Sequence, residues 1–186
     1  MQQDPETPID QPAADVAVAS PEAEAPTINA DRLNDLMTRL KARENIVMGG
    51  IAGLVAALVG AGIWAAITVA TNFQIGWMAI GVGFLCGYAV RFMGKGVSDH
   101  FGYVGAACAL FGCLLGNFFS IVGFIAKEFS VGFFEVLTQM DYALLPEIMG
   151  ETFSPIDLLF YGFALYAGYK NSFHQLTEAD MQAVVD

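Results

Sequence analysis

The sequence predicts an all-α membrane protein: a bundle of four transmembrane helices with interfacial amphipathic helices. Two uncharged runs point to this class, because residues 45–90 and 101–126 contain no Asp, Glu, Lys, Arg or His. About 20 helical residues cross a hydrocarbon core of roughly 30 Å, so each run is long enough to cross a membrane. The composition agrees, since 55% of the 186 residues are hydrophobic and only 15% are charged, less charge than a soluble domain carries.

The first 28 residues form a segment of different character. They hold six acidic residues, five prolines and no basic residue. Such a composition buries too little apolar surface to fold, so we expect a disordered, acidic, Pro/Ala-rich cytoplasmic leader. Its expected role is to stay solvated; docking of a basic partner is the alternative. No signal peptide is expected, because the first apolar run begins at residue 45 and is too long for one.

Residues 29–44 are predicted to form an amphipathic juxtamembrane helix. Apolar side chains recur there at the i, i+3, i+4 and i+7 positions of one helical face, at Leu33, Leu36, Met37 and Leu40. Asn29 or Asp31 is a suitable N-cap. This helix is expected to lie on the membrane surface or to pair with a copy of itself.

Three spans are predicted from the uncharged runs. The first run is interrupted at residues 71–74, so it predicts two helices, at about 45–70 and 75–92, and the second run predicts a third at about 101–126. Glycines four residues apart occur in all three spans, at Gly49, Gly53, Gly83, Gly87, Gly112 and Gly116. Helices in lipid associate by close approach at small residues, so these glycines are predicted to pack the helices into a compact bundle.

The C-terminal third contains a mixed segment and a fourth apolar one. Residues 127–153 hold five acidic residues and one lysine among many aromatic and aliphatic residues, which predicts one or two short helices in the interface plane. Ser154 and Pro155 suit the start of a helix. A fourth span is therefore predicted at about 155–170, followed by a polar tail at 173–186.

The basic residues predict an orientation for these four spans. Seven of the eight fall on one side of the predicted topology, at Arg32, Arg39, Lys41, Arg43, Arg91, Lys95 and Lys170. Lys127 alone falls on the other side. Cytoplasmic loops carry an excess of Lys and Arg, so both termini are expected in the cytoplasm.

The loop at residues 91–100 is the strongest candidate site. Arg91 and Lys95 lie among glycines there, and they are candidate contacts for a lipid headgroup or another anion. The alternative, which we favour, is a tight turn whose cations set the topology. The loop lacks the spacing of a nucleotide-binding P-loop.

No catalytic, cofactor-binding or metal-ligating residue is expected. The sequence shows no enzyme signature, and its three cysteines, all within predicted spans, have neither disulfide nor metal-site spacing. The centre of each predicted span lacks ionisable residues, which counts against a proton-coupled transporter. The main polar groups of the third span, Asn117 and Ser120, are expected to bond between helices or back to their own helix.

Three stretches carry a resemblance to known proteins: GWMAIGVGFLCGYAVRFMGKG at 76–96, LFGCLLGNFFSIVGFIAK at 110–127 and ETFSPIDLLFYGFALYAGYK at 151–170. In these stretches the chain resembles a group of small four-span bacterial inner-membrane proteins of uncharacterised function. The resemblance covers about residues 45–172. It implies a bacterial cytoplasmic membrane and a four-span body, and it implies no activity.

The expected function is that of a non-enzymatic structural or accessory component of the inner membrane. The alternative is a small channel or a lipid or solute transporter with the 91–95 loop at its inner mouth, and an intramembrane enzyme ranks last. The expected partners are the lipid bilayer and either a second copy of the chain or other membrane proteins. No nucleic acid is expected as a partner.

Overall fold

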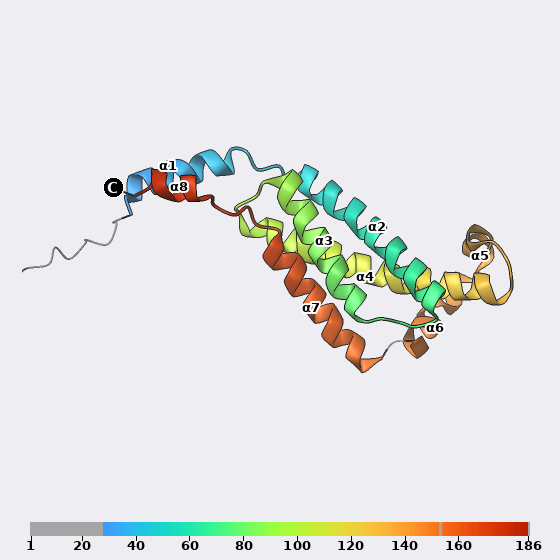
Figure 1. The fold of residues 1–186 in the computed structure, drawn as a ribbon. Helices are drawn as coiled ribbons and strands as arrows, with labels where there is room; N and C mark the ends of the chain where they lie inside the picture. Colours follow the sequence, from blue (N-terminus) through green and yellow to red (C-terminus); the bar gives the residue numbers. More distant parts are fainter. Residues whose placement is uncertain (1–27, 153, 186) are drawn as a thin grey trace, which may run out of the picture.

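The computed structural model describes residues 28–152 and 154–185, so the predicted acidic leader lies outside the described residues except for Ile28. The described chain is helical apart from its loops and one isolated β-bridge. The elements in chain order are α1 (Ala30–Lys41), α2 (Ile46–Thr71), α3 (Trp77–Gly94), α4 (Asp99–Glu128), α5 (Phe133–Gln139), a short 3₁₀ helix η1 (Tyr142–Leu144), α6 (Leu145–Thr152), α7 (Pro155–Asn171) and α8 (Glu178–Ala183) (Figure 1).

Four of these helices form the body of the protein. Helices α3 and α4 pack against each other, and each also packs against both α2 and α7, which lie on opposite flanks (Figure 1). Helices α2, α3 and α4 are long and apolar enough to cross a membrane. Helix α7 has 17 residues, or about 25 Å at 1.5 Å per residue. The bounds of these four helices lie within two residues of those predicted from the sequence, whereas α1 ends at Lys41, three residues before the predicted end at 44.

The ends of the long helices follow local signals in the sequence. Asn45 caps α2 by accepting a hydrogen bond from the Met48 N–H at 3.0 Å, and Asn72 ends α2 in the left-handed conformation at φ 56°. Asparagine tolerates that conformation better than most residues. The predicted interruption at 71–74 is therefore confirmed as the turn between α2 and α3. At the start of α7, the Ser154 N–H donates to Asp157 Oδ2 at 2.8 Å.

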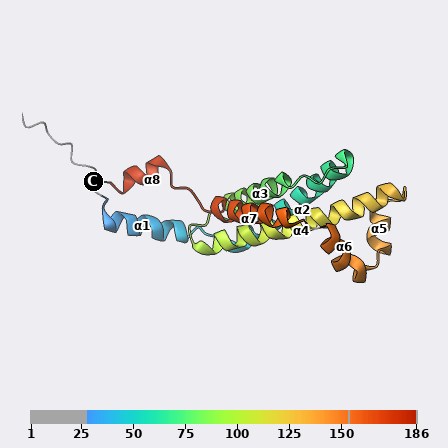
Figure 2. The same ribbon diagram turned by 90° about the horizontal axis from the view of Figure 1, so that it is seen from below.

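The two described chain ends meet beyond one end of the bundle, where α1 and α8 lie (Figures 1 and 2). Ile28 and Val185 form an antiparallel bridge, and the Asn29 N–H donates to the Val184 carbonyl at 2.8 Å. Val184 is 2% exposed. The polar tail was not predicted to contain a helix. Helix α8 begins there with a capping box: Thr177 Oγ1 accepts from the Asp180 N–H at 3.3 Å, and the Thr177 N–H donates to Asp180 Oδ2 at 2.9 Å.

Helices α5 and α6 lie at the opposite end of the bundle (Figure 2). One or two short helices are predicted in this segment, and the structure forms α5, η1 and α6 there. The apolar face of α5 packs against α4, because Val136 joins Val122 and Ala126 of α4 in one buried cluster. A location in the interface plane stays a prediction. Phe134, on another side of α5, is 77% exposed.

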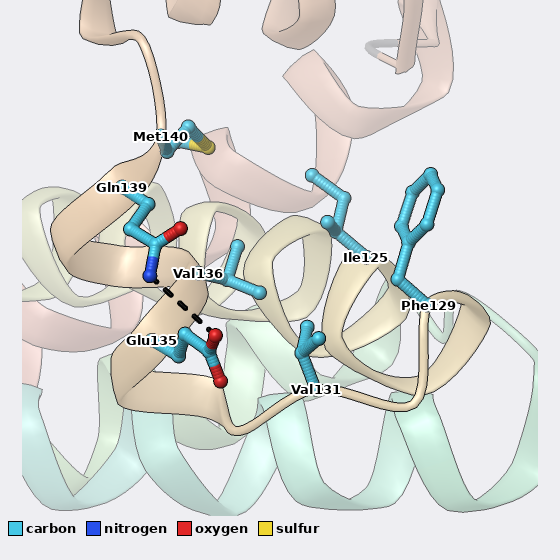
Figure 3. A pocket seen from close by; sticks show the side chains of 7 residues that line it. All are labelled: Ile125, Phe129, Val131, Glu135, Val136, Gln139 and Met140. Carbon is cyan, nitrogen blue, oxygen red and sulfur yellow. Dashed lines mark hydrogen bonds between the residues drawn. The ribbon is translucent and has the colours of Figure 1, made fainter.

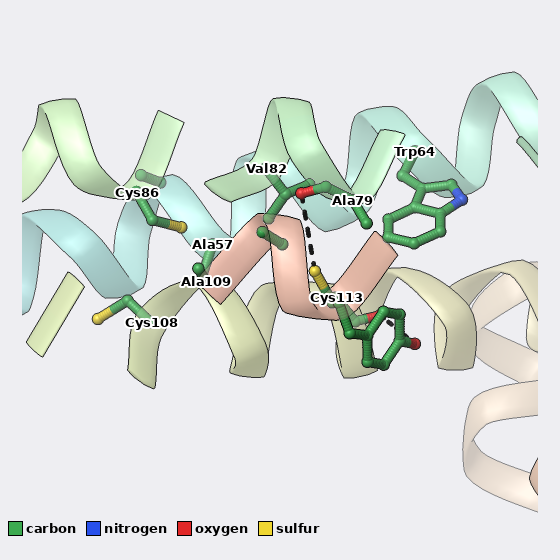
Figure 4. Packing of buried hydrophobic residues seen from close by; sticks show 11 residues of the cluster. Ala57, Trp64, Ala79, Val82, Cys86, Cys108, Ala109 and Cys113 are labelled. Atoms are coloured by element: carbon green, nitrogen blue, oxygen red, sulfur yellow. Dashed lines mark hydrogen bonds between the residues drawn. The ribbon is translucent and has the colours of Figure 1, made fainter. Parts of the chain in front are cut away.

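The bundle places small residues inside and large apolar residues outside. Nine residues of α2 are buried, and seven of them are Gly or Ala. Ile51, Val55 and Leu58 of the same helix are each at least half exposed. The core shown in Figure 4 has the same character: Ala57, Ala79 and Ala109 are fully buried between helices. A water-soluble bundle has the reverse distribution, with its large apolar residues in the core.

Candidate functional site

The loop between α3 and α4 contains the predicted candidate site, and it is tightly folded. Helix α3 ends at Gly94, and Lys95 caps it with a left-handed backbone at φ 49° and an N–H that donates to the Arg91 carbonyl at 3.0 Å. Gly96 follows, and a Cβ there would overlap the ring of Phe101. Glycine is thus required at this position for the loop to fold back on α4.

A carboxylate of the protein occupies the N–H groups of this loop. Glu44, just before α2, accepts hydrogen bonds at Oε1 from the Val97 N–H at 2.7 Å and from the Ser98 N–H at 2.8 Å. The Ser98 hydroxyl also donates to it, with 2.8 Å to each carboxylate oxygen. Burial by itself raises the pKa of Glu44, but these hydrogen bonds to the charged form outweigh it and lower the pKa.

The C-terminal segment holds the other side of the same loop. The His174 N–H donates to the Gly96 carbonyl at 2.7 Å, and the Arg91 guanidinium donates to Gln175 Oε1 at 3.0 Å. On the α2 side, the Asn45 N–H donates to the Gly94 carbonyl at 2.9 Å. The loop therefore joins the entry to α2, the end of α3, the start of α4 and the exit from α7.

The folded loop limits which groups could contact an anion at the predicted site of Arg91 and Lys95. The Val97 and Ser98 N–H groups bind Glu44, so an external anion would contact side chains rather than these backbone groups. Lys95 is exposed, and Arg91 is partly exposed with its guanidinium 5.9 Å from the centre of the Phe92 ring. A headgroup contact at Arg91 and Lys95 stays a prediction.

The six glycines predicted to pack helices all lie at contacts between helices. A Cβ on Gly49 would lie 3.1 Å from Gly94 Cα, and one on Gly53 would lie 2.7 Å from a Val90 methyl. At the other four, an added Cβ would meet a side chain or backbone of a neighbouring helix: Ala164 at Gly83, Asn171 at Gly87, Val82 at Gly112 and Trp64 at Gly116.

Two further glycines make a close contact between α4 and α7. A Cβ on Gly168 would lie 2.7 Å from the Gly105 carbonyl oxygen, and one on Gly105 would overlap Ser172. Gly62, Gly81 and Gly162, in contrast, have nothing within 4 Å of an added Cβ. The glycine content of a helix does not tell which glycines lie at contacts and which face open space, because that depends on which face of the helix meets a neighbour.

Three polar side chains, of Trp64, Thr68 and Asn117, are buried in the half of the bundle towards the α5 end, and we call them the buried polar cluster. Trp64 and Thr68 are one turn apart on α2, at 2% and 0% exposed, and Asn117 of α4 is 2% exposed. The Asn117 side-chain oxygen accepts a hydrogen bond from Gln74 Nε2 at 3.2 Å. In the described protein, Trp64 Nε1, Thr68 Oγ1 and Asn117 Nδ2 are buried without a hydrogen-bond partner.

Sequence reasoning found part of this cluster. It singled out Asn117 and Ser120, and Ser120 donates back to the Gly116 carbonyl of its own helix at 2.7 Å. It did not find Trp64, Thr68 or Gln74. Threonine one turn after tryptophan on the small-residue face of α2 was the available signal.

Buried thiols line the core without forming a reactive centre. Cys86, Cys108 and Cys113 are all buried and unbridged, and Cys113 Sγ lies 3.8 Å from the Ala79 carbonyl oxygen (Figure 4). Over the part of the chain that the structure describes, no three His, Cys, Asp or Glu side chains come together as metal ligands.

Comparison of the chain with known protein families, with curated proteins and with solved structures finds no match in any of the three. The resemblance to small four-span inner-membrane proteins therefore stays a prediction. The function has to be argued from the geometry of this chain.

Proposed function

We propose that the protein is an integral membrane protein in which α2, α3, α4 and α7 each cross the bilayer, and that it acts as a non-enzymatic structural or accessory component of a bacterial inner membrane. The observation that carries the membrane assignment is the inverted packing of the bundle. Large side chains such as Ile51, Leu58 and Ile63 are exposed on α2, while its buried face is mostly Gly and Ala. Soluble monomers rarely expose large continuous apolar surfaces, whereas helices in lipid pack through small residues.

The arrangement of the chain ends supports a fourth crossing by α7. Helices α1 and α8 meet at one end of the bundle, and α5 and α6 lie at the other (Figure 1). A chain that enters and leaves on one side crosses an even number of times. Helix α7 has 17 residues, at the short end of the range for a span.

The charges support a cytoplasmic location for the described chain ends. Seven of the eight basic residues lie at or near the α1–α8 end, and Lys127 lies at the other end. Cytoplasmic flanks carry the excess of Lys and Arg, so we place both described chain ends in the cytoplasm.

A structural or accessory role follows from what the bundle is built to do. Its contacts bring helix backbones close together, and the Val97 and Ser98 N–H groups of the loop between α3 and α4 bind the protein's own Glu44. Its large exposed side chains, which occur on α2, α3, α4 and α7, are available to neighbours in the membrane. This architecture suits a component that associates with a second copy or another membrane protein.

Site-specific photo-crosslinking in membranes tests this role. A photoreactive residue replaces Leu58 on the α2 flank or Phe163 on the α7 flank, which are 50% and 47% exposed. A discrete protein adduct from at least one flank is expected, and a difference between the flanks identifies the interface. Adducts with lipid alone from both flanks would contradict an accessory role.

The second candidate is a small channel or a lipid or solute transporter. The observation that favours it is the set of unpartnered polar atoms of Trp64, Thr68 and Asn117 inside the bundle, since buried polar groups without partners need water or a ligand. Flux through liposomes containing the purified protein separates the two proposals. A robust flux that is lost in Lys95→Ala would replace the accessory role with this one.

A further inference from the structure

A large apolar groove lies between α2, α4 and α5 at the end of the bundle away from the described chain ends. Its volume is about 720 Å³, within the range of sites that bind small molecules. Its α2 wall includes Gly62, Ala66 and Ala70, which follow one face over nine residues, a rise of about 12 Å. Phe133 and Phe134 of α5 form part of the opposite wall.

The groove is open because of the residues that form it. Gly62 has nothing within 4 Å of an added Cβ, so its side of α2 is unfilled. Helix α5 is held away from α2 because Val136 anchors it to Val122 and Ala126 of α4. The cavity on the other side of this contact is smaller, about 320 Å³, and Glu135 lines it (Figure 3).

One cation lies at the groove. Lys127 lines it, and its ammonium donates to the Val69 carbonyl at 3.0 Å and to Asn72 Oδ1 at 2.8 Å. Both partners are uncharged, so neither neutralises the lysine. An ammonium has three donors, which leaves one for an external acceptor.

The surrounding charge selects among acceptors. Between residues 96 and 169 the sequence contains no Lys or Arg other than Lys127, whereas residues 127–152 hold five carboxylates, including the adjacent and exposed Glu128. A purely anionic headgroup would be repelled by this net negative end of the molecule. A headgroup with both a phosphate and a primary amine matches it, because the phosphate can pair with Lys127 and the amine with the adjacent carboxylate of Glu128.

From this geometry we infer that the groove binds one zwitterionic aminophospholipid, with an acyl chain along the Gly62–Ala70 face and its phosphate on Lys127. This inference rests on the proposed membrane insertion of α2 and α4. It places a lipid between α2 and α5, where the lipid fills the space that α5 leaves open.

Lipid retention by the purified full-length protein tests the inference. The protein is exchanged in detergent against equal amounts of phosphatidylethanolamine and phosphatidylglycerol, and bound lipid is counted by native mass spectrometry. We expect one phosphatidylethanolamine per chain to be retained in preference to phosphatidylglycerol. Gly62→Leu, which fills the groove, should reduce that retention about tenfold. Gly81→Leu is the matched control, because Gly81 also has open space around its Cβ and lies outside the groove.

Lys127 variants test the headgroup contact separately. Lys127→Gln should weaken retention several-fold, and Lys127→Arg, which keeps the charge, should restore most of it. Equal retention by the wild type, Gly62→Leu and Gly81→Leu would overturn the inference, as would a preference for phosphatidylglycerol. Extraction of membranes at alkaline pH distinguishes this failure from failure of the proposed function: a protein that stays in the membrane but retains no lipid refutes only the groove.

Discussion

Glu44 and Ser98 are 54 residues apart in the chain and are joined through two donors of the serine: its N–H, 2.8 Å from Oε1 of Glu44, and its hydroxyl, which lies 2.8 Å from each carboxylate oxygen. Together with the Val97 N–H, they attach the segment that enters α2 to the first turn of α4. Hydrogen bonds to a charged group are stronger than those between neutral groups. This single carboxylate is therefore expected to hold the start of α2 beside the start of α4.

The Glu44 contact predicts an acid-sensitive contribution to stability. The pKa of Glu44 in the folded protein is below its ordinary value of 4.5, because its carboxylate accepts hydrogen bonds from Ser98 and Val97. The contribution is therefore full above pH 4.5 and is lost as the pH falls through the lower folded value. Glu44→Gln should be less stable than the wild type by about 1–2 kcal/mol at neutral pH. Thermal unfolding in detergent across this pH range should show the gap closing in acid, and a constant gap would contradict the prediction.

The contact between α3 and α7 predicts intolerance of a single methyl group at Gly83. A Cβ there would lie 2.8 Å from the Ala164 Cα, and backbone cannot move aside as a side chain can. Gly83→Ala should therefore cost about 1–3 kcal/mol, as overpacking of a core does. Gly81→Ala is the control, two residues away with open space around its Cβ. Unfolding in detergent should separate the two, and equal stabilities would show that α3 and α7 are not in this contact.

The buried polar cluster predicts a stabilising substitution. Thr68 is fully buried and its hydroxyl has no partner in the described protein, so Thr68→Val removes an unsatisfied group and keeps the shape. A gain of about 1 kcal/mol is expected. Thr71→Val is the control, because the Thr71 hydroxyl donates to the Ile67 carbonyl at 2.8 Å. A loss of stability in Thr68→Val would instead show that water or a ligand satisfies the hydroxyl.

The proposed four crossings predict where fused reporters are active. Alkaline phosphatase, which is active only outside the cytoplasm, should be active when fused after Gly132 and inactive when fused after Val185. A fluorescent protein that folds in the cytoplasm should give the opposite pattern at the same positions. Active phosphatase at Val185 would remove α7 from the set of crossings and leave three.

Much of the helix framework could be predicted because it depends on local signals. Uncharged runs set the bounds of α2, α3 and α4, and Asn72 marks the turn between the first two. The start of α1 is also set by a local signal, since the Asn29 side chain caps it by accepting hydrogen bonds from the Asp31 and Arg32 N–H groups. These signals are contained within a few residues of chain.

The parts that were missed depend on distant residues. Glu44 appeared in the sequence as the last charge of an amphipathic helix, and only the fold brings Ser98 to it. The apolar face of α5 was visible in the sequence, but periodicity cannot tell whether such a face meets lipid or α4. The groove at Gly62 was missed for the same reason: a glycine facing open space and one facing a helix have the same local pattern.

The bridge between Ile28 and Val185 determines how the protein responds to mechanical load. Tension applied through the chain at these two residues is first resisted by the bridge and by the neighbouring hydrogen bond from the Asn29 N–H to the Val184 carbonyl. Until those few bonds rupture, the helices of the bundle carry little of the pull.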